Sequence, residues 1–171
     1  MSRTAYECIE LLAEGRSLIE ALADEDYAFA CEDSAGSSPG AHTRYFLDFV
    51  DCLLTGIDAQ QIDCTARKRR GGVEASRVIR CRQIGHVIEG LEHIQHLDGR
   101  LPLEVRPEPD QDWTRSTLSR ELQFVSGHVV HHQALIRMTL AHRGRGTARN
   151  GVTPSTRGHQ NAQREFSCDS D

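Results

Sequence analysis

Aromatic residues are scarce in this chain and make up 5% of its 171 residues. A buried core must therefore be built mainly from Leu, Ile, Val and Ala. The chain also lacks any run of about 18 apolar residues, the minimum for a membrane-spanning helix. Its first segment, Met1–Gly15, does not show the basic stretch followed by an apolar one that is typical of a secretory signal. We therefore expect a cytoplasmic protein with no membrane partner.

An excess of positive charge is also missing. The sequence has 20 Lys and Arg residues against 25 Asp and Glu residues, which gives a formal net charge of −5 at pH 7. Proteins that bind nucleic acid through its phosphates need a surplus of cations. One short basic segment, residues 143–149, is too small to reverse this balance. The composition therefore predicts no nucleic-acid partner.

The six cysteines show no Cys-x-x-Cys pair and no regular spacing. They lie at positions 8, 31, 52, 64, 81 and 168. A disulfide framework or a cysteine-based zinc ribbon requires tighter clustering. We therefore interpret the cysteines as reduced thiols, most of which are small side chains of the core.

Helical periodicity, with apolar residues three or four positions apart, recurs in four segments. These are Thr4–Asp24, Ala41–Gly56, Val73–Leu97 and a segment that begins at Ser116 or Thr117 and ends near His142. Such helices most simply pack as a bundle, so we expect an all-α four-helix bundle with long connections over residues 1–158. Residues 159–171 are expected to form an irregular, mobile tail. The proline-rich segment 100–109 cannot be helical, and its apolar alternation allows a short strand or hairpin.

Three of the nine histidines are predicted to converge inside this bundle. His42 projects onto the apolar face of its helix, and His128 and His132 lie one turn apart on an inward edge of the last helix. Two imidazoles at positions i and i+4 can bind one divalent ion, and a third from a facing helix leaves one coordination position open. The pattern predicts a site for Zn, Ni or Fe. The alternative is that these histidines are core residues whose ring nitrogens are satisfied by hydrogen bonds.

Four further residues are candidates for contact with a substrate or for support of the site. His131 lies beside the pair on the last helix, and Glu121 projects onto nearly the same face as His128. Two helical turns, about 10 Å, separate Glu121 from His128. We therefore favour for Glu121 the role of a first-turn carboxylate stabilised by the helix dipole. Arg69 and Arg70 belong to a basic loop that either is simply solvated or recruits an anionic substrate.

The arrangement of these histidines resembles the DinB-like family of bacterial four-helix bundles. The resemblance is carried by Gly40-Ala-His-Thr-Arg-Tyr-Phe-Leu-Asp48, by Ser116-Thr-Leu-Ser-Arg-Glu-Leu122, by Gly127-His-Val-Val-His-His-Gln-Ala-Leu-Ile136 and by the segment Gly151-Val-Thr-Pro-Ser-Thr156. It implies a divalent metal bound by one histidine of the second helix and a His-x-x-x-His pair of the last. Relatives often carry further histidines where this chain has Tyr45 and Phe49.

Two kinds of function follow from the resemblance. Family members include transferases that act on low-molecular-weight thiols, so the first hypothesis is a metal-dependent thiol S-transferase or a hydrolase-like enzyme with a small-molecule thiol as its partner. The second is a non-catalytic metal-binding or interaction bundle with a vestigial site, which the lost histidines and the lack of an evident general base favour. An exposed apolar side of the bundle would also be compatible with a homodimer. Fold alone does not choose between these functions.

Overall fold

The computed structural model describes residues 3–31, 36–66 and 76–145, and this part of the chain is mostly helical. In chain order its elements are α1 (Arg3–Glu20), α2 (Asp24–Tyr27), α3 (Pro39–Gly56), β1 (Gln61–Asp63), a 3₁₀ turn (Cys64–Ala66), α4 (Arg77–Ile94), β2 (Pro102–Arg106), β3 (Thr114–Thr117) and α5 (Leu118–His142). The three strands form a small mixed sheet. The expectation of an all-α fold is therefore wrong in this respect.

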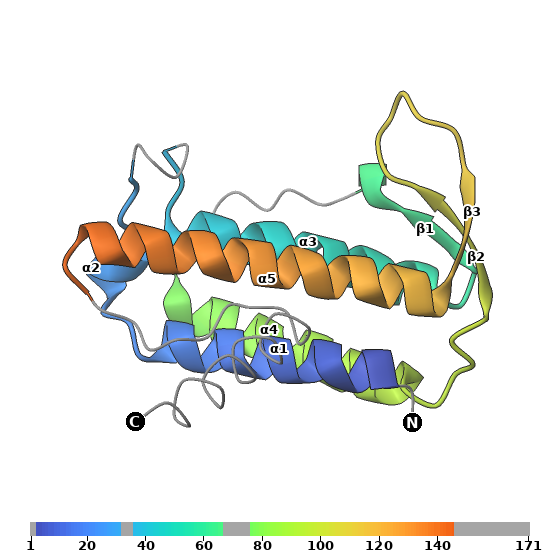
Figure 1. Ribbon diagram of the computed structural model, residues 1–171, viewed down its shortest axis with the longest axis horizontal. Coiled ribbons are helices and arrows are strands. Elements are labelled where there is room, and N and C mark those ends of the chain that lie inside the picture. The colour runs from blue at the N-terminus through green and yellow to red at the C-terminus, as the bar shows by residue number, and fades with distance from the viewer. Residues whose placement is uncertain (1–2, 32–35, 67–75, 146–171) are drawn as a thin grey trace, which may run out of the picture.

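The axes of the four long helices are roughly aligned, with α1 and α5 running opposite to α3 and α4, and the helices enclose the core (Figure 1). Helix α1 packs against α4 and α5, and α3 packs against the same two helices from the other side. The apolar face predicted for the last helix is confirmed, since Leu118, Leu122, Val125 and Val129 are all buried. Burial of such apolar side chains stabilises the fold by roughly 25 cal/mol per Å² of apolar surface removed from water.

The first helix is shorter than its periodicity predicts. It ends at Glu20 rather than at Asp24, and the separate short helix α2 begins at Asp24. The chain is extended at Ala23, with φ −71° and ψ 154°, which interrupts the helical hydrogen bonding. This break turns Tyr27 into the core, where its side chain is completely buried.

Polar side chains cap the starts of the three helices that follow. The hydroxyl of Ser38 accepts a hydrogen bond from the backbone N–H of Ala41, and Pro39 stands at the first position of α3. Ser76 caps α4 and Thr117 caps α5 in the same way. These residues satisfy N–H groups that a helix leaves without internal partners. The cap at Thr117 decides between the two predicted starts of the last helix.

The sheet lies at the end of the helices where α5 begins (Figure 1). Strand β1 pairs in parallel with β2, and β2 pairs antiparallel with β3. The side chains of Leu103 and Val105 are buried, so the apolar alternation in the proline-rich segment does mark a strand. Because β3 runs directly into α5, the sheet fixes where the first turn of α5 starts.

Several predictions fall outside the residues that the structure describes. These are the basic loop with Arg69 and Arg70, the tail 159–171 and Cys168. Within the described residues, no disulfide bond joins the other five cysteines. None of the helices in these same ranges is long and apolar enough to cross a lipid bilayer.

Candidate functional site

Three imidazole rings come together between α3 and α5. The ring centre of His132 lies 5.3 Å from that of His42 and 4.4 Å from that of His128. His42 is contributed by the first turns of α3, whereas the other two lie one turn apart on α5. Exposed fractions of 4% for His42 and 8% for His132 confirm that both face the protein interior. His128 is partly buried.

The closest contact in this cluster joins two ring nitrogens. Nδ1 of His42 and Nδ1 of His132 are 3.1 Å apart, so in the metal-free protein one ring donates a hydrogen bond to the other. Nε2 of His42 is buried and has no hydrogen-bond partner among the described residues. Protein contacts therefore satisfy only one of the two nitrogens of His42. Leaving a buried polar atom unpaired costs about 1–3 kcal/mol.

Burial keeps the inner pair of imidazoles uncharged. The pKa of His132 is lowered to about 3, first by loss of solvation and then by the charges that the neighbouring rings of His128, His42 and His131 carry when protonated. The pKa of His42 is also lowered, first by burial and then by the charge that His131 carries when protonated. Both rings are therefore neutral at pH 7, the protonation state in which an imidazole nitrogen can bind a metal ion.

Aromatic side chains surround the imidazoles on their outer side. The ring of Tyr45 is stacked on His132 with centres 5.5 Å apart, and the edge of Phe49 meets His128 at 4.4 Å. The ring of Phe124 is stacked on His128 with centres 6.0 Å apart. These rings restrict the access of water to the cluster, which is the physical cause of the low pKa of His132.

As the side chains are placed, the cluster is not a complete metal site. Within the ranges that the structure describes, no three or more His, Cys, Asp or Glu side chains are arranged so that they could hold a metal ion. The cluster instead consists of one pair of nitrogens in close contact and a third imidazole packed against the pair by its ring.

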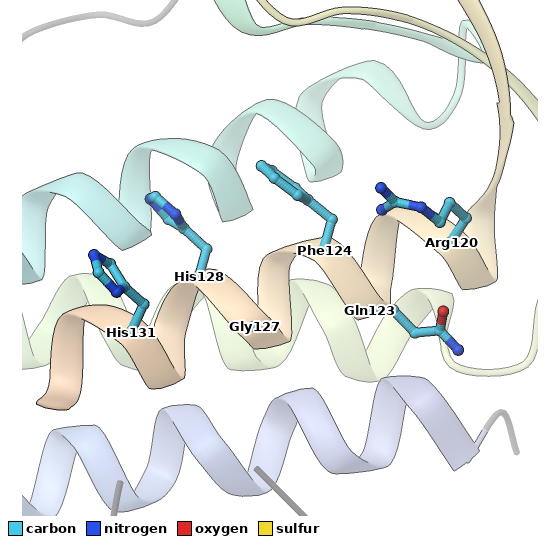
Figure 2. Close-up of a pocket in the computed structure, with 6 residues that line it drawn as sticks. All are labelled: Arg120, Gln123, Phe124, Gly127, His128 and His131. Carbon is cyan, nitrogen blue, oxygen red and sulfur yellow. The ribbon is translucent and has the colours of Figure 1, made fainter. Parts of the chain in front are cut away.

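A shallow pocket of about 410 Å³ lies beside the cluster on α5. It is lined by Arg120, Gln123, Phe124, Gly127, His128 and His131. Figure 2 shows the side chains of Arg120, Phe124 and His128 following one another along α5 and projecting from it toward α3, whereas Gln123 points away. His128 therefore borders both the pocket and the buried pair. A small molecule in this pocket would contact the outermost imidazole of the cluster.

The remaining predicted residues divide into those near the cluster and those elsewhere. His131 is exposed, lines the pocket and has its ring centre 5.2 Å from that of His132. Glu121 instead accepts a hydrogen bond from the hydroxyl of Ser116 in the first turn of α5, in agreement with its favoured interpretation as a first-turn carboxylate. Outside the cluster, the α4 histidines at positions 86 and 93 are exposed, as predicted for surface residues.

The sequence interpretation missed four residues of the pocket, Arg120, Gln123, Phe124 and Gly127, whereas His128 and His131 were predicted. Arg120, Phe124 and His128 follow one another at intervals of four, which places them on one helix face. That spacing was visible in the sequence. The role of Gly127 was not visible in the sequence, because it depends on the open space around that residue in the folded protein.

Comparison of the chain with protein-family models, with curated proteins and with solved structures finds no match. The function is therefore argued from the residues of the cluster and the pocket.

Proposed function

We propose that this protein binds a divalent metal ion through the imidazoles of His42, His128 and His132. In this proposal the four long helices form a bundle of the DinB-like type, and the protein acts in the cytoplasm. The observation that carries the proposal is the pair of buried, neutral imidazoles whose Nδ1 atoms lie 3.1 Å apart. Two imidazole ligands suit a soft to borderline divalent ion better than Mg²⁺ or Ca²⁺, which prefer oxygen ligands.

The spacing of this pair fits two ligands of one ion. Metal–nitrogen bonds of about 2.0–2.1 Å at angles of about 90–110° put the two nitrogens roughly 2.9–3.4 Å apart, and the observed separation falls in this range. The proposal requires the His128 ring, which already contacts His132, to turn toward the pair. Three nitrogen ligands are compatible with Zn, Ni or Fe and leave at least one position open.

The adjoining pocket extends the proposal to chemistry on a small molecule. A bound divalent ion would supply Lewis acidity, which suits a thiol S-transferase or a hydrolase-like enzyme. In the pocket, Arg120 would hold an anionic group of the substrate and Phe124 its apolar part. His131 is exposed at the same place and is the residue best placed to take up or release a proton there.

A specific observation also supports a non-catalytic protein. None of the six residues that line the pocket is Asp or Glu, so the pocket lacks a carboxylate that could act as a general base. Tyr45 and Phe49 also shield the imidazoles from the α3 side. The second candidate is therefore a bundle that binds metal without turnover and acts through interaction with other molecules.

Metal analysis of tag-free protein tests the proposal. After EDTA treatment and reloading with Zn²⁺, Ni²⁺ or Fe²⁺, we expect one equivalent of metal per chain. A metal concentration of 100 Kd contributes about 2.7 kcal/mol of stability, which corresponds to a rise in Tm of about 5–10 °C for a chain of this size. His42→Ala and His132→Ala should each weaken binding by about 100-fold or more, because each removes a ligand.

Matched substitutions on the protein surface provide the control. His86→Ala removes an imidazole from α4 whose side chain is 80% exposed, and His93→Ala removes a second exposed one. Both variants should bind metal like the parent protein. The proposal is wrong if the parent protein binds no metal, or if the α3 and α5 variants bind it as tightly as these controls.

An assay of turnover then separates the two candidates. The metal-loaded protein is mixed with cysteine and a chromogenic alkylating electrophile, and thioether formation is followed above the uncatalysed rate. Acceleration that His131→Ala reduces while metal content stays unchanged supports the enzyme. Metal binding with no acceleration for any thiol tested supports the non-catalytic bundle.

A further inference from the structure

The pocket on α5 has the charge of an anion-binding site. Arg120 is the one residue with a permanent charge among the six that line it. No carboxylate pairs with Arg120 among the residues that the structure describes, and its guanidinium lies 5.9 Å from the ring centre of Phe124. A guanidinium without an acidic partner retains its donors for a carboxylate, sulfonate or phosphate.

An apolar surface lies next to this charge. Phe124 is 40% exposed although it is a large aromatic residue, and it stands between Arg120 and His128 along the helix (Figure 2). Eight residues of α-helix separate Arg120 from His128, which corresponds to about 12 Å. A ligand that spans this distance must carry an anionic group at one end and apolar atoms over Phe124.

The backbone of Gly127 borders open space in this part of the pocket. A Cβ atom added to Gly127 would meet nothing within 4 Å. Glycine inside an α-helix is less favourable than alanine by about 1 kcal/mol, so stability alone would favour a larger residue. The exposed backbone at Gly127 therefore leaves room for a ligand to approach α5.

We infer that this pocket binds a small organic anion with an aromatic or other apolar body, whose anionic group is held by Arg120 and whose body lies on Phe124 and Gly127. The inference rests on the proposed function insofar as it makes this ligand the molecule that faces His128. The binding itself needs no metal, because neither the charge nor the apolar surface involves the buried pair.

Titration with 4-phenylbutyrate, followed by NMR or calorimetry, tests the inference, and the neutral 4-phenylbutanamide serves as the matched ligand. We expect the amide to bind about tenfold more weakly or worse, since it lacks the charge-assisted hydrogen bond to the guanidinium. Arg120→Gln should cause a similar loss for the acid and none for the amide. Arg115→Gln, which changes an arginine of β3 that is 95% exposed, is the control and should leave binding unchanged.

Substitutions of Gly127 test the shape of the pocket. Gly127→Leu should abolish binding, and the open space around the added side chain lets the variant fold. Gly127→Ala should raise the midpoint of thermal unfolding and still lower the affinity for 4-phenylbutyrate. Gly85→Ala is the control on α4, where the added Cβ meets only Arg16 at an ordinary distance of 3.5 Å. It should raise the midpoint without changing the affinity.

The outcome separates this inference from the proposed function when the titrations are done both in EDTA and with Zn²⁺. Binding of 4-phenylbutyrate in EDTA that is lost in Arg120→Gln supports the inference even if the protein binds no zinc. Zinc binding without any binding of the anion overturns the inference and leaves the metal proposal intact. Equal binding of acid and amide, or unchanged binding in Gly127→Leu, also overturns it.

Discussion

Acid should destabilise the metal-free protein through His132. The pKa of this imidazole is about 3 in the folded protein, against an ordinary value of 6.5. Between pH 3 and pH 6.5, the unfolded chain therefore binds a proton on His132 that the folded protein does not bind. The contribution of His132 to stability is fully present above pH 6.5 and is lost progressively as the pH falls toward 3.

The size of this effect follows from the two pKa values. At pH 5 the unfolded state is stabilised by protonation of His132 by about 2 kcal/mol, whereas at pH 7 the corresponding figure is only a few tenths. His132 is 8% exposed, so solvent screens this effect little. A loss of about 2 kcal/mol lowers Tm by roughly 4–8 °C in a domain of this size. The lowered pKa of His42 acts in the same direction.

The assay compares urea unfolding at pH 7 and pH 5 in EDTA for the parent protein and for His132→Gln. Glutamine cannot be protonated in this range, so the loss of stability between the two pH values should shrink by about 2 kcal/mol in the variant. His86→Gln is the matched control, because the side chain of His86 is 80% exposed. It should show the same difference as the parent.

Two outcomes would refute this reasoning. An equal loss of stability in the parent protein and in His132→Gln would show that His132 is protonated as readily in the folded state as in the unfolded one. A stability that rises between pH 7 and pH 5 would show that the imidazole is charged and paired in the folded protein. Either result would also remove the neutral ring on which the metal proposal depends.

Two further predictions concern the end of the molecule that carries the sheet. Gly56→Ala should lower the free energy of unfolding, measured with urea, by about 2–3 kcal/mol. The added Cβ would lie 2.3 Å from the backbone oxygen of Gln61. Unchanged stability would show that the connection between α3 and β1 is looser than described. The hydrogen bonds from Arg106 and Thr65 hold the pKa of Asp63 at about 2, so Arg106→Gln should raise that pKa toward 3.8 in an NMR titration. An unchanged value would assign the shift to Thr65 alone.

The sequence predicted the long helices well because their apolar residues repeat with the helical period over many turns. It predicted the sheet only in part, at β2, where Leu103 and Val105 alternate with polar residues. Strand β1 has three residues, and all four residues of β3 are polar, so neither has an apolar pattern that a sequence can show. These strands exist because β2 pairs with them.

The same reasoning separates what could and could not be predicted at the site. Periodicity was enough to point His42 and His132 inward, because burial on a helix depends on the angular position of a residue. The distance of 3.1 Å between their nitrogens depends on how α3 and α5 approach each other, which no local pattern encodes. The pocket was missed because its shape depends on how the side chains of α5 stand beside α3 (Figure 2), which the sequence alone does not show.

Protons and metal ions compete for the same lone pairs on imidazole nitrogens. Burial weakens the binding of the proton, because it lowers the pKa of the ring. Exposed histidines lose metal affinity once the pH falls below about 6.5. In the folded protein, the pKa of about 3 keeps His132 uncharged at pH 5, so acid should remove this ligand by unfolding the chain rather than by protonating the ring in the folded site. The burial that makes the fold sensitive to acid thus keeps the nitrogen available to a metal ion as long as the fold persists.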